Sequence, residues 1–148
     1  MTKALLGAGC FWGVEEKFRK LKGVLNTKVG YSGGHTKNPN YEEVCSGTTE
    51  HAEVIKIEFD PNIITYQDIL KNFWECHDPT QLNRQGSDVG RQYRSSIFYF
   101  NDEQKDIALE SKKQKQTDLK NLIVTEVAPA KIFYLAEEYH QLFIYKRA

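Results

Sequence analysis

The chain has 148 residues, and its 20 Lys and Arg residues balance 20 Asp and Glu residues, so the formal net charge at pH 7 is zero. With 40% apolar residues, this length favours a single folded domain over residues 1–148 and excludes a disordered chain. A nucleic-acid partner would require a basic excess, and no stretch is apolar for long enough to predict a membrane span, so we expect neither.

Hydrophobic periodicity and turn residues divide the chain into strands and helices. The predicted elements are a strand at 3–8, a helix at 11–22, strands at 24–34 and 52–60, a helix at 65–77, a strand at 95–100, a helix at 101–119 and a strand at 122–127. This order predicts an α+β fold, a ferredoxin-like two-layer sandwich in which helices cover a mixed β-sheet. The aromatic-rich residues 133–148 are expected to lie over the core.

Two long segments, around residues 32–52 and 77–94, are polar, rich in turn residues and without clear periodicity. Loops of this length inside a compact domain are commonly functional. We therefore expect these two loops to surround an active site that is built on the sheet.

Three cysteines, Cys10, Cys45 and Cys76, lie far apart in the sequence. An odd number at long spacings argues against a secreted disulfide scaffold and favours a cytoplasmic protein with at least one free thiol. No close pair of Cys or His residues has the spacing of a zinc site, so we expect no bound metal. Cys76 follows Trp74 in a predicted helix and is expected to be a packed core thiol. We expect the chain to be a monomer.

The segment GAGCFWGVEEKF, residues 7–18, places Cys10 between a strand and the helix that follows. A lone Cys is more often a buried structural residue, but the unpaired N–H groups at a helix N-terminus favour a thiolate, so Cys10 is a candidate nucleophile. The side chains of Phe11 and Trp12 point about 100° apart on a helix, so they do not both fit on the apolar face that packs into the core. A small apolar pocket beside the thiol, suited to a methyl or thioether group, explains the pair better.

The two long loops contribute further candidate residues. The hydroxyl groups of Tyr41 and Tyr93 can donate hydrogen bonds. Glu53 begins an otherwise apolar strand, where burial would raise its pKa and allow it to act as an acid. Asp88 lies near Tyr93 in the second loop. Each of these residues alone is more often an ordinary surface residue, and only their joint placement favours a site.

Five segments of the chain are similar, in the same order, to the motifs of one enzyme family. They are GCFWG at 9–13, GYSGG at 30–34, NPNYEEVCSGTTEHAEV at 38–54, HDPTQLNRQGSDVGRQYRSSIFY at 77–99 and AEEYHQ at 136–141. On these motifs the sequence resembles the peptide methionine sulfoxide reductases of the A class over nearly its whole length. The resemblance implies an oxidoreductase that reduces the S epimer of methionine sulfoxide in oxidised proteins or peptides, and so repairs oxidative damage. Activity on free methionine sulfoxide stays open.

The resemblance also implies roles for the residues at the start of the first helix. Cys10 matches the nucleophile that attacks the sulfoxide sulfur and becomes a sulfenic acid. Phe11 and Trp12 match the walls of the pocket that holds the methyl group of the substrate. The apolar pocket inferred from the residues themselves is thus the one that the family would place there.

The residues of the two loops match the groups that handle the sulfoxide oxygen. Tyr41, Glu53 and Tyr93 match its binding groups, with Glu53 as the acid that protonates it. Asp88 matches a residue that helps to shape the substrate site. A sulfoxide oxygen carries negative charge and leaves more readily when it is protonated, so donors placed around it would stabilise the transition state.

Many relatives carry resolving cysteines in a glycine-rich C-terminal tail, and the FIYKRA ending of this sequence has none. We expect no bound cofactor and an external thiol reductant, either thioredoxin or glutathione with glutaredoxin. An internal disulfide is the alternative, with Cys45 the better candidate for a resolving thiol and Cys76 the weaker one. Unreactive thiols at both positions are the simpler expectation. Glu50 stands where many relatives have glycine, and we expect it to face solvent.

Two other classes of function remain open. A cysteine hydrolase would pair Cys10 with His51 or His140, although the aromatic pair and the tyrosine and glutamate residues suit an oxygen acceptor better. A binding module that stacks bases on exposed aromatic residues is disfavoured by the neutral charge. His51, His77 and His140 are expected to order loops by hydrogen bonding rather than to catalyse.

Overall fold

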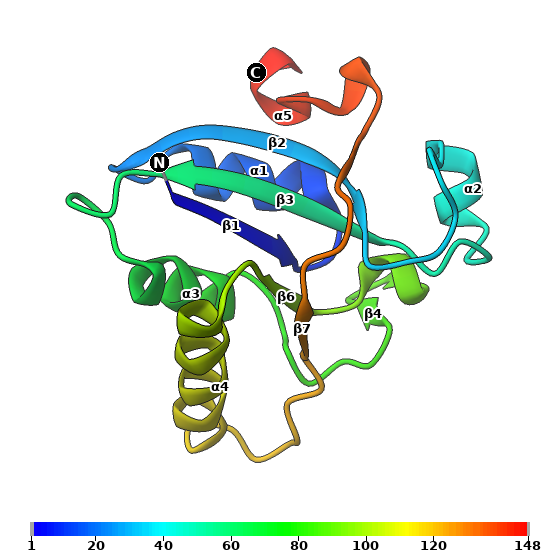
Figure 1. Ribbon diagram of the computed structural model, residues 1–148. Helices are drawn as coiled ribbons and strands as arrows, with labels where there is room; N and C mark the ends of the chain where they lie inside the picture. Colours follow the sequence, from blue (N-terminus) through cyan, green and yellow to red (C-terminus); the bar gives the residue numbers. More distant parts are fainter. Residues whose placement is uncertain (1, 148) are drawn as a thin grey trace.

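A computed structural model describes residues 2–147, which form a six-stranded sheet in the order β7-β6-β1-β3-β2-β8 and a small β4-β5 hairpin (Figure 1). The strands are β1 (Thr2–Gly7), β2 (Val24–Ser32), β3 (Ala52–Phe59), β4 (Arg84–Gln85), β5 (Asp88–Val89), β6 (Ser96–Tyr99), β7 (Glu126–Pro129) and β8 (Tyr134–Leu135). In the large sheet β6 and β7 pair in parallel and the other neighbours pair antiparallel. The sheet is therefore mixed, as predicted.

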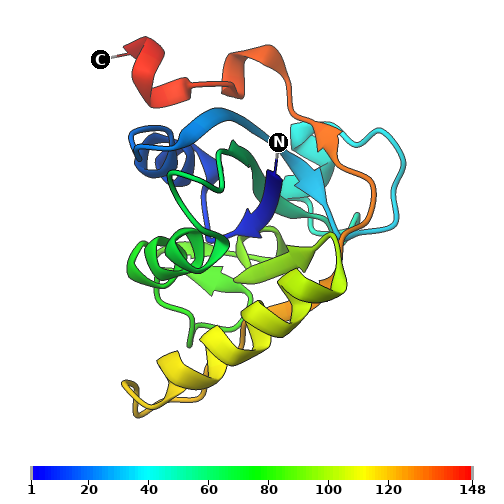
Figure 2. The same ribbon diagram turned by 60° about the vertical axis from the view of Figure 1, so that its left-hand side comes forward.

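The helices complete a two-layer arrangement. They are α1 (Phe11–Arg19), α2 (Tyr41–Cys45), α3 (Tyr66–Glu75), α4 (Asp102–Gln116) and α5 (Phe143–Arg147), with 3-10 turns η1 (Arg91–Tyr93) and η2 (Glu138–His140). The succession β1-α1-β2-β3-α3-β6, with its strand order β6-β1-β3-β2, is that of a ferredoxin-like sandwich. This confirms the predicted fold class. The helix α4 packs on α3 outside that unit, at the opposite end of the molecule from α5 (Figure 2).

Side chains alternate between the two faces of the sheet, as the period of two along a strand requires. Leu6 of β1 and Ile55 of β3 belong to the core between the sheet and the helices, whereas Val54 points to the opposite face. Phe133 and its neighbours cover that opposite face, where the C-terminal segment runs across the sheet in Figure 1. The same alternation places Glu53 on the helix side, in line with Ile55.

The two irregular segments contain short elements that periodicity did not predict. In the first, the Asn40 side chain accepts from the Glu43 N–H and the Glu43 side chain accepts from the Asn40 N–H, a capping box that begins α2. In the second, the β4-β5 hairpin is followed by η1. The last predicted strand, 122–127, is shifted to Glu126–Pro129, because its parallel pairing with β6 begins only at Glu126.

The segment after β8 returns over α1 and β2. Gln141 holds it there: its Oε1 accepts from the Val29 N–H at 2.9 Å, and its Nε2 donates to the carbonyl oxygens of Val29 at 2.8 Å and Ala136 at 3.0 Å. Ala136 and His140 are buried, whereas α5 contains no buried residue. The tail therefore covers the core as far as η2 and then lies on the surface. Within residues 2–147, no helix is long and apolar enough to cross a membrane.

Gly34 lies where the chain after β2 passes close to residues 49–51. A Cβ atom on Gly34 would clash with the Thr49 carbonyl oxygen and the His51 nitrogen, which are backbone atoms. Gly34→Ala is expected to lower the free energy of unfolding by about 1–3 kcal/mol. A Cβ on Gly13, inside α1, meets nothing within 4 Å, so Gly13→Ala should raise it by about 0.5–1 kcal/mol. Urea titration followed by circular dichroism would measure both, and equal stability of the two variants would contradict this packing argument.

Candidate active site

Cys10 lies between the end of β1 at Gly7 and the start of α1 at Phe11, at the strand-to-helix junction that the sequence predicted. It is half-buried, and its side chain makes no capping hydrogen bond to the helix. Gly9 has a φ of +97°, a left-handed conformation that glycine adopts readily. A Cβ on Gly9 would stand 2.9 Å from the Cβ of Gln85. The β4-β5 hairpin therefore packs against the turn that carries the thiol.

Burial raises the pKa of the Cys10 thiol to about 11. The nearby backbone N–H groups of Trp12 and Gly13 lower it, and the negative charges of Glu53 and Asp88 add to the rise. The helix N-terminus was expected to produce a thiolate. The N–H groups of the helix N-terminus do lower the pKa of the thiol. Burial and the charges of Glu53 and Asp88 raise it by more. Without a ligand, Cys10 is therefore a thiol at neutral pH.

Glu53 lies on β3 opposite Tyr31 of β2 and is 1% exposed. Its Oε1 accepts a hydrogen bond from the Phe11 N–H at 3.2 Å, and its Oε2 has no partner among the described residues. Burial raises the pKa of Glu53 to about 8, with the Phe11 N–H lowering it and the charge of Asp88 raising it further. The carboxyl group therefore keeps its proton at neutral pH, and one of its two oxygens makes no hydrogen bond to the described residues.

The two aromatic residues at the start of α1 have different surroundings. Phe11 is buried, and its ring centroid lies 5.8 Å from that of Tyr31. Trp12 is half-buried, with its ring stacked on Phe143 at a centroid distance of 3.8 Å. The Trp12 Nε1–H donates to Nδ1 of His140 at 2.9 Å. The two rings thus do not both pack on the face of α1 that points into the core. The C-terminal segment fixes the orientation of the Trp12 indole.

Tyr41 and Tyr93 come from the two irregular segments. Tyr41 is the first residue of α2; its backbone N–H donates to Oε2 of Glu137 at 3.1 Å, and its ring lies 6.4 Å from that of Trp12. Tyr93 ends η1. Burial raises the pKa of both phenols, to about 12 for Tyr93, and the charge of Glu53 contributes at each. Both hydroxyl groups therefore remain hydrogen-bond donors at neutral pH, near the same carboxyl group.

Asp88 lies exposed on β5, at the edge of this cluster. Burial is the main reason that the pKa values of Cys10, Glu53 and Tyr93 are raised. The negative charge of Asp88 raises each of them further. In Figure 1 both α2 and β4 lie on the right-hand side, toward which the tip of β1 points. The predicted site residues that the structure gathers there are Cys10, Phe11, Trp12, Tyr41, Glu53, Asp88 and Tyr93.

The other two cysteines differ in their surroundings, and both are free thiols. Cys45, the last residue of α2, is exposed. Cys76 follows α3, where its thiol donates to the Phe73 carbonyl oxygen at 3.2 Å and packs against the core. Of these two, only Cys45 lies beside the residues gathered around α1.

The histidines have structural partners. Nδ1 of His51 accepts from the Gly34 N–H at 2.9 Å, and its Nε2 lies 2.6 Å from a carbonyl oxygen of the same loop. Nδ1 of His140 accepts from the Trp12 indole. In the described part of the chain, no histidine hydrogen-bonds Cys10, and no three His, Cys, Asp or Glu side chains are grouped to hold a metal. This arrangement does not favour a cysteine hydrolase.

Two contributors to the site were not predicted. Glu137 joins two elements, because its Oε1 accepts from the Tyr31 hydroxyl at 2.9 Å while its Oε2 accepts from the Tyr41 N–H. Phe143 supports the outer face of the Trp12 indole. The motif AEEYHQ was an available signal for Glu137, since it marks a segment of interest. A single phenylalanine in an aromatic-rich tail provides no comparable signal.

Glu50 is exposed to solvent, as expected. Its carboxylate pairs with Arg91 at 2.7 Å and lies 3.7 Å from Nε2 of His35. Its φ of +61° is in the left-handed region, which glycine adopts at lower cost than glutamate.

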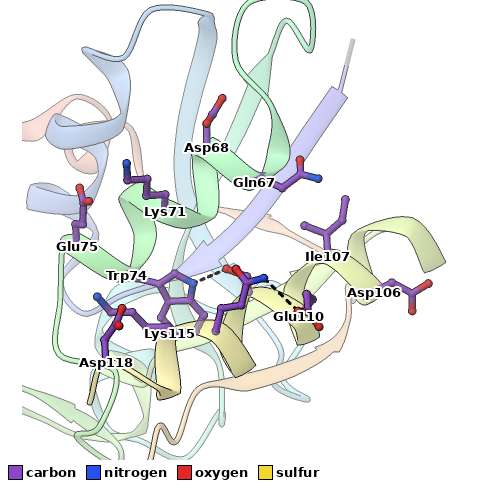
Figure 3. A pocket seen from close by; sticks show the side chains of 12 residues that line it. Gln67, Asp68, Lys71, Trp74, Glu75, Asp106, Ile107, Glu110, Lys115 and Asp118 are labelled. Carbon is purple, nitrogen blue, oxygen red and sulfur yellow. Dashed lines mark hydrogen bonds between the residues drawn. The ribbon is translucent and has the colours of Figure 1, made fainter. Parts of the chain in front are cut away.

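A separate groove of about 780 Å³ lies between α3 and α4 (Figure 3). The Trp74 Nε1–H at its floor donates to the Ser111 hydroxyl at 2.7 Å. The groove is lined by Gln67, Asp68, Lys71, Trp74, Glu75, Asp106, Ile107, Glu110, Ser111, Gln114, Lys115 and Asp118. This lining includes no thiol and none of the residues gathered around Cys10, so the groove is not part of the candidate site.

Comparison with known proteins agrees with this geometry. The family model described as peptide methionine sulfoxide reductase matches residues 2–148. The peptide methionine sulfoxide reductase MsrA of Methanothermobacter thermautotrophicus is 56% identical over 146 residues, which cover 97% of this chain and 86% of that protein.

Solved structures of the yeast protein Mxr1 are also similar. The reduced form from Saccharomyces cerevisiae superposes with a TM-score of 0.94 at 38% identity, covering 98% of this chain and 84% of that one. Mxr1 in complex with Trx2 superposes with a TM-score of 0.70 at 28% identity, covering 94% and 83%. The matched length, the identity and the shared fold together show that this chain belongs to the peptide methionine sulfoxide reductase family.

Proposed function

We propose that this chain reduces the S epimer of methionine sulfoxide, in oxidised proteins or peptides, to methionine. The observation that carries the proposal is a thiol next to a protonated acid. Cys10 immediately precedes α1, and Glu53 accepts from the N–H of the next residue, Phe11, at 3.2 Å, with its other oxygen unpartnered by described residues. A sulfoxide oxygen must gain a proton to leave. Glu53 holds one at neutral pH, because burial raises its pKa to about 8.

In the proposed reaction the sulfur of Cys10 attacks the sulfur of the sulfoxide while Glu53 protonates the sulfoxide oxygen. The attack forms a bond between the two sulfur atoms. That bond and the substrate S–O bond then break as the hydroxyl group passes to the Cys10 sulfur, which becomes a sulfenic acid. The sulfoxide gains two electrons and becomes a thioether, and the Cys10 sulfur loses two. Hydroxyl donors at Tyr41 and Tyr93 would stabilise the negative charge on the oxygen in the transition state.

The methyl group of the substrate would lie against Phe11 and Trp12. The burial of Phe11 and the half-burial of Trp12 support this placement, because together they offer one fixed apolar wall and one accessible wall next to the thiol. Asp88, exposed on the hairpin, would shape the open edge of the site.

A second turnover requires reduction of the sulfenic acid. We infer that an external dithiol of the thioredoxin class supplies the two electrons, and the solved complex of Mxr1 with Trx2 supports this inference. Glutathione with glutaredoxin is the other candidate reductant. Neither route requires a cofactor bound to the chain.

The proposed function predicts that the chain consumes one half of an epimeric mixture of methionine sulfoxide in a short peptide. Chromatography that separates the two epimers would follow the reaction with dithiothreitol as donor. Cys10→Ser should form no methionine, because it lacks the nucleophile, whereas Cys76→Ser should match the unmodified chain. Loss of both epimers, or activity in Cys10→Ser, would contradict the proposed reaction.

The pH dependence follows from two groups. The reactive form has Cys10 ionised and Glu53 protonated, whereas at neutral pH both groups carry their protons. As the pH rises toward about 8, more Cys10 ionises and the rate increases; above that value, loss of the Glu53 proton offsets the further gain, and the rate levels off.

Glu53→Gln removes the titrating acid while it keeps the size of the side chain. We expect the rate of methionine formation to fall by about 100- to 10,000-fold. The remaining rate should keep increasing through pH 8, because only the thiol then titrates. Initial rates from pH 6 to pH 10 would test this. A plateau near the same pH in the variant would show that Glu53 is not the acid.

A separate prediction concerns the resting thiol. Because the Glu53 charge raises the pKa of Cys10, Glu53→Gln should lower that pKa, and Asp88→Asn should lower it less. The rate at which iodoacetamide alkylates Cys10, measured against pH in a Cys45→Ser, Cys76→Ser background, reports the pKa directly. An unchanged or higher pKa in Glu53→Gln would contradict the electrostatic coupling between the two groups.

A further inference from the structure

Glu15, on α1, has a buried carboxyl group that the proposed reaction does not use. Its side chain is 1% exposed, and a carboxyl group in such a place is costly unless its oxygens accept hydrogen bonds. Its Oε2 accepts from the Thr27 hydroxyl at 2.8 Å, and its Oε1 accepts from the Leu142 N–H at 2.7 Å. One oxygen therefore binds β2, and the other binds the C-terminal segment.

Leu142 lies where the C-terminal segment turns into α5. Its φ of +50° is in the left-handed region, a conformation of higher energy for a residue with a Cβ atom. Its carbonyl oxygen accepts from the Lys146 N–H at 2.9 Å, which closes the first turn of α5. By binding the Leu142 N–H, Glu15 holds this turn and fixes the place where α5 begins.

Three residues of α1, Trp12, Glu15 and Arg19, contact this end of the chain, and their spacing of three and four places them on one face of the helix. The Trp12 ring stacks on Phe143 with an interplanar angle of 7°. The Arg19 guanidinium group lies 4.5 Å from the centroid of the Tyr145 ring. The helix α5 contains no buried residue. Of the three contacts, only that of Glu15 comes from a fully buried side chain, so water competes with it least.

The Trp12 indole is held at its edge and on one face. The edge is fixed by the hydrogen bond from Nε1–H to Nδ1 of His140, and the face is covered by Phe143 at a centroid distance of 3.8 Å. If Phe143 left, the indole could tilt about its edge. The space between Trp12 and the thiol therefore depends on Phe143, and Phe143 directly follows the residue that Glu15 binds.

We propose that Glu15 is a positioning residue for the methyl pocket. By holding the Leu142 N–H, it keeps Phe143 stacked on Trp12, and so it sets the width of a pocket that accepts a methyl sulfoxide and disfavours a sulfoxide with a larger alkyl group. This inference rests on the proposed function, because Trp12 is a wall of the methyl pocket only in that reaction.

Initial rates with two peptides, one with methionine sulfoxide and one with ethionine sulfoxide, test the proposal. Glu15→Leu keeps the bulk of the side chain but removes both acceptor oxygens. It should raise KM for the methyl substrate about 10-fold with a smaller change in kcat, because the apolar contact with the methyl group is made in the bound state as well as in the transition state. The preference for the methyl substrate over the ethyl substrate, expressed as the ratio of kcat/KM values, should fall. Partial loss of folded chain would lower both rates equally and leave this ratio unchanged.

Two conservative variants serve as controls. Glu15→Gln keeps an acceptor oxygen for the Leu142 N–H and should retain the KM and the ratio of the unmodified chain. Glu16→Gln makes the same change at the next residue, whose carboxyl group pairs only with Arg19 and Lys20 of its own helix. It should also match the unmodified chain.

A spectroscopic measurement follows the linkage without any substrate. The chain has two tryptophans, so a nitrogen-15 spectrum contains two indole N–H signals, and the signal lost in Trp12→Phe belongs to Trp12. Glu15→Leu should shift the Trp12 signal, because the Phe143 ring leaves its face, and should leave the Trp74 signal in place. Phe143→Ala should lower the substrate ratio as Glu15→Leu does. If Glu15 acts through Phe143, the double variant should be no worse than either single variant.

An unmoved Trp12 signal or an unchanged substrate ratio in folded Glu15→Leu would overturn the proposal, as would additive effects in the double variant. Circular dichroism establishes whether each variant is folded. If Glu15→Leu does not fold, Thr27→Val takes its place: it removes the hydroxyl that holds Oε2 of Glu15, and the same changes should appear to a smaller extent. Failure of the unmodified chain to form methionine would contradict the proposed function, whereas the Trp12 signal would still report the linkage to Glu15.

Discussion

The reactive end of this molecule depends on the hydrogen bond from the Phe11 backbone N–H to Glu53. This bond joins the first turn of α1 to the beginning of β3, and so it holds a carboxyl group beside the residue that carries the thiol. Glu53 lies in a row of apolar side chains, where a charge is poorly solvated, and it therefore keeps its proton. The same burial keeps Cys10 protonated. At neutral pH, the thiol of Cys10 and the carboxyl group of Glu53 are therefore both uncharged.

A segment far along the chain stabilises this arrangement. Nδ1 of His140 accepts from the Trp12 indole, Glu137 accepts from the Tyr41 N–H, and Gln141 binds the backbone of β2. The orientation of the Trp12 indole and the position of the Tyr41 backbone are thus set by residues more than ninety positions later. A rigid sheet with its helices supplies the position of Cys10, whereas the loops and the tail supply the groups around it.

The sequence alone predicted the scaffold where its signals are local. The alternation over 52–60 gave β3 within one residue of its observed end, and the helix after Thr65 begins with the capping box that its side chain forms with Asp68. Where pairing is non-local the prediction was less accurate: β7 is shifted because β6 sets its register. The helix α2 is too short to show a period, so it was missed.

For the site, the motifs predicted which residues take part, because each motif carries its own residue types at fixed spacing. The protonation state of Cys10 was decided by the tertiary structure. The helix N-terminus is a local feature and predicted a thiolate, whereas burial and the charge of Glu53, more than forty residues away, raise the pKa. The support of Trp12 by His140 was likewise decided only on folding. Local chemistry is encoded residue by residue, but solvation and long-range electrostatics exist only once distant segments are packed together.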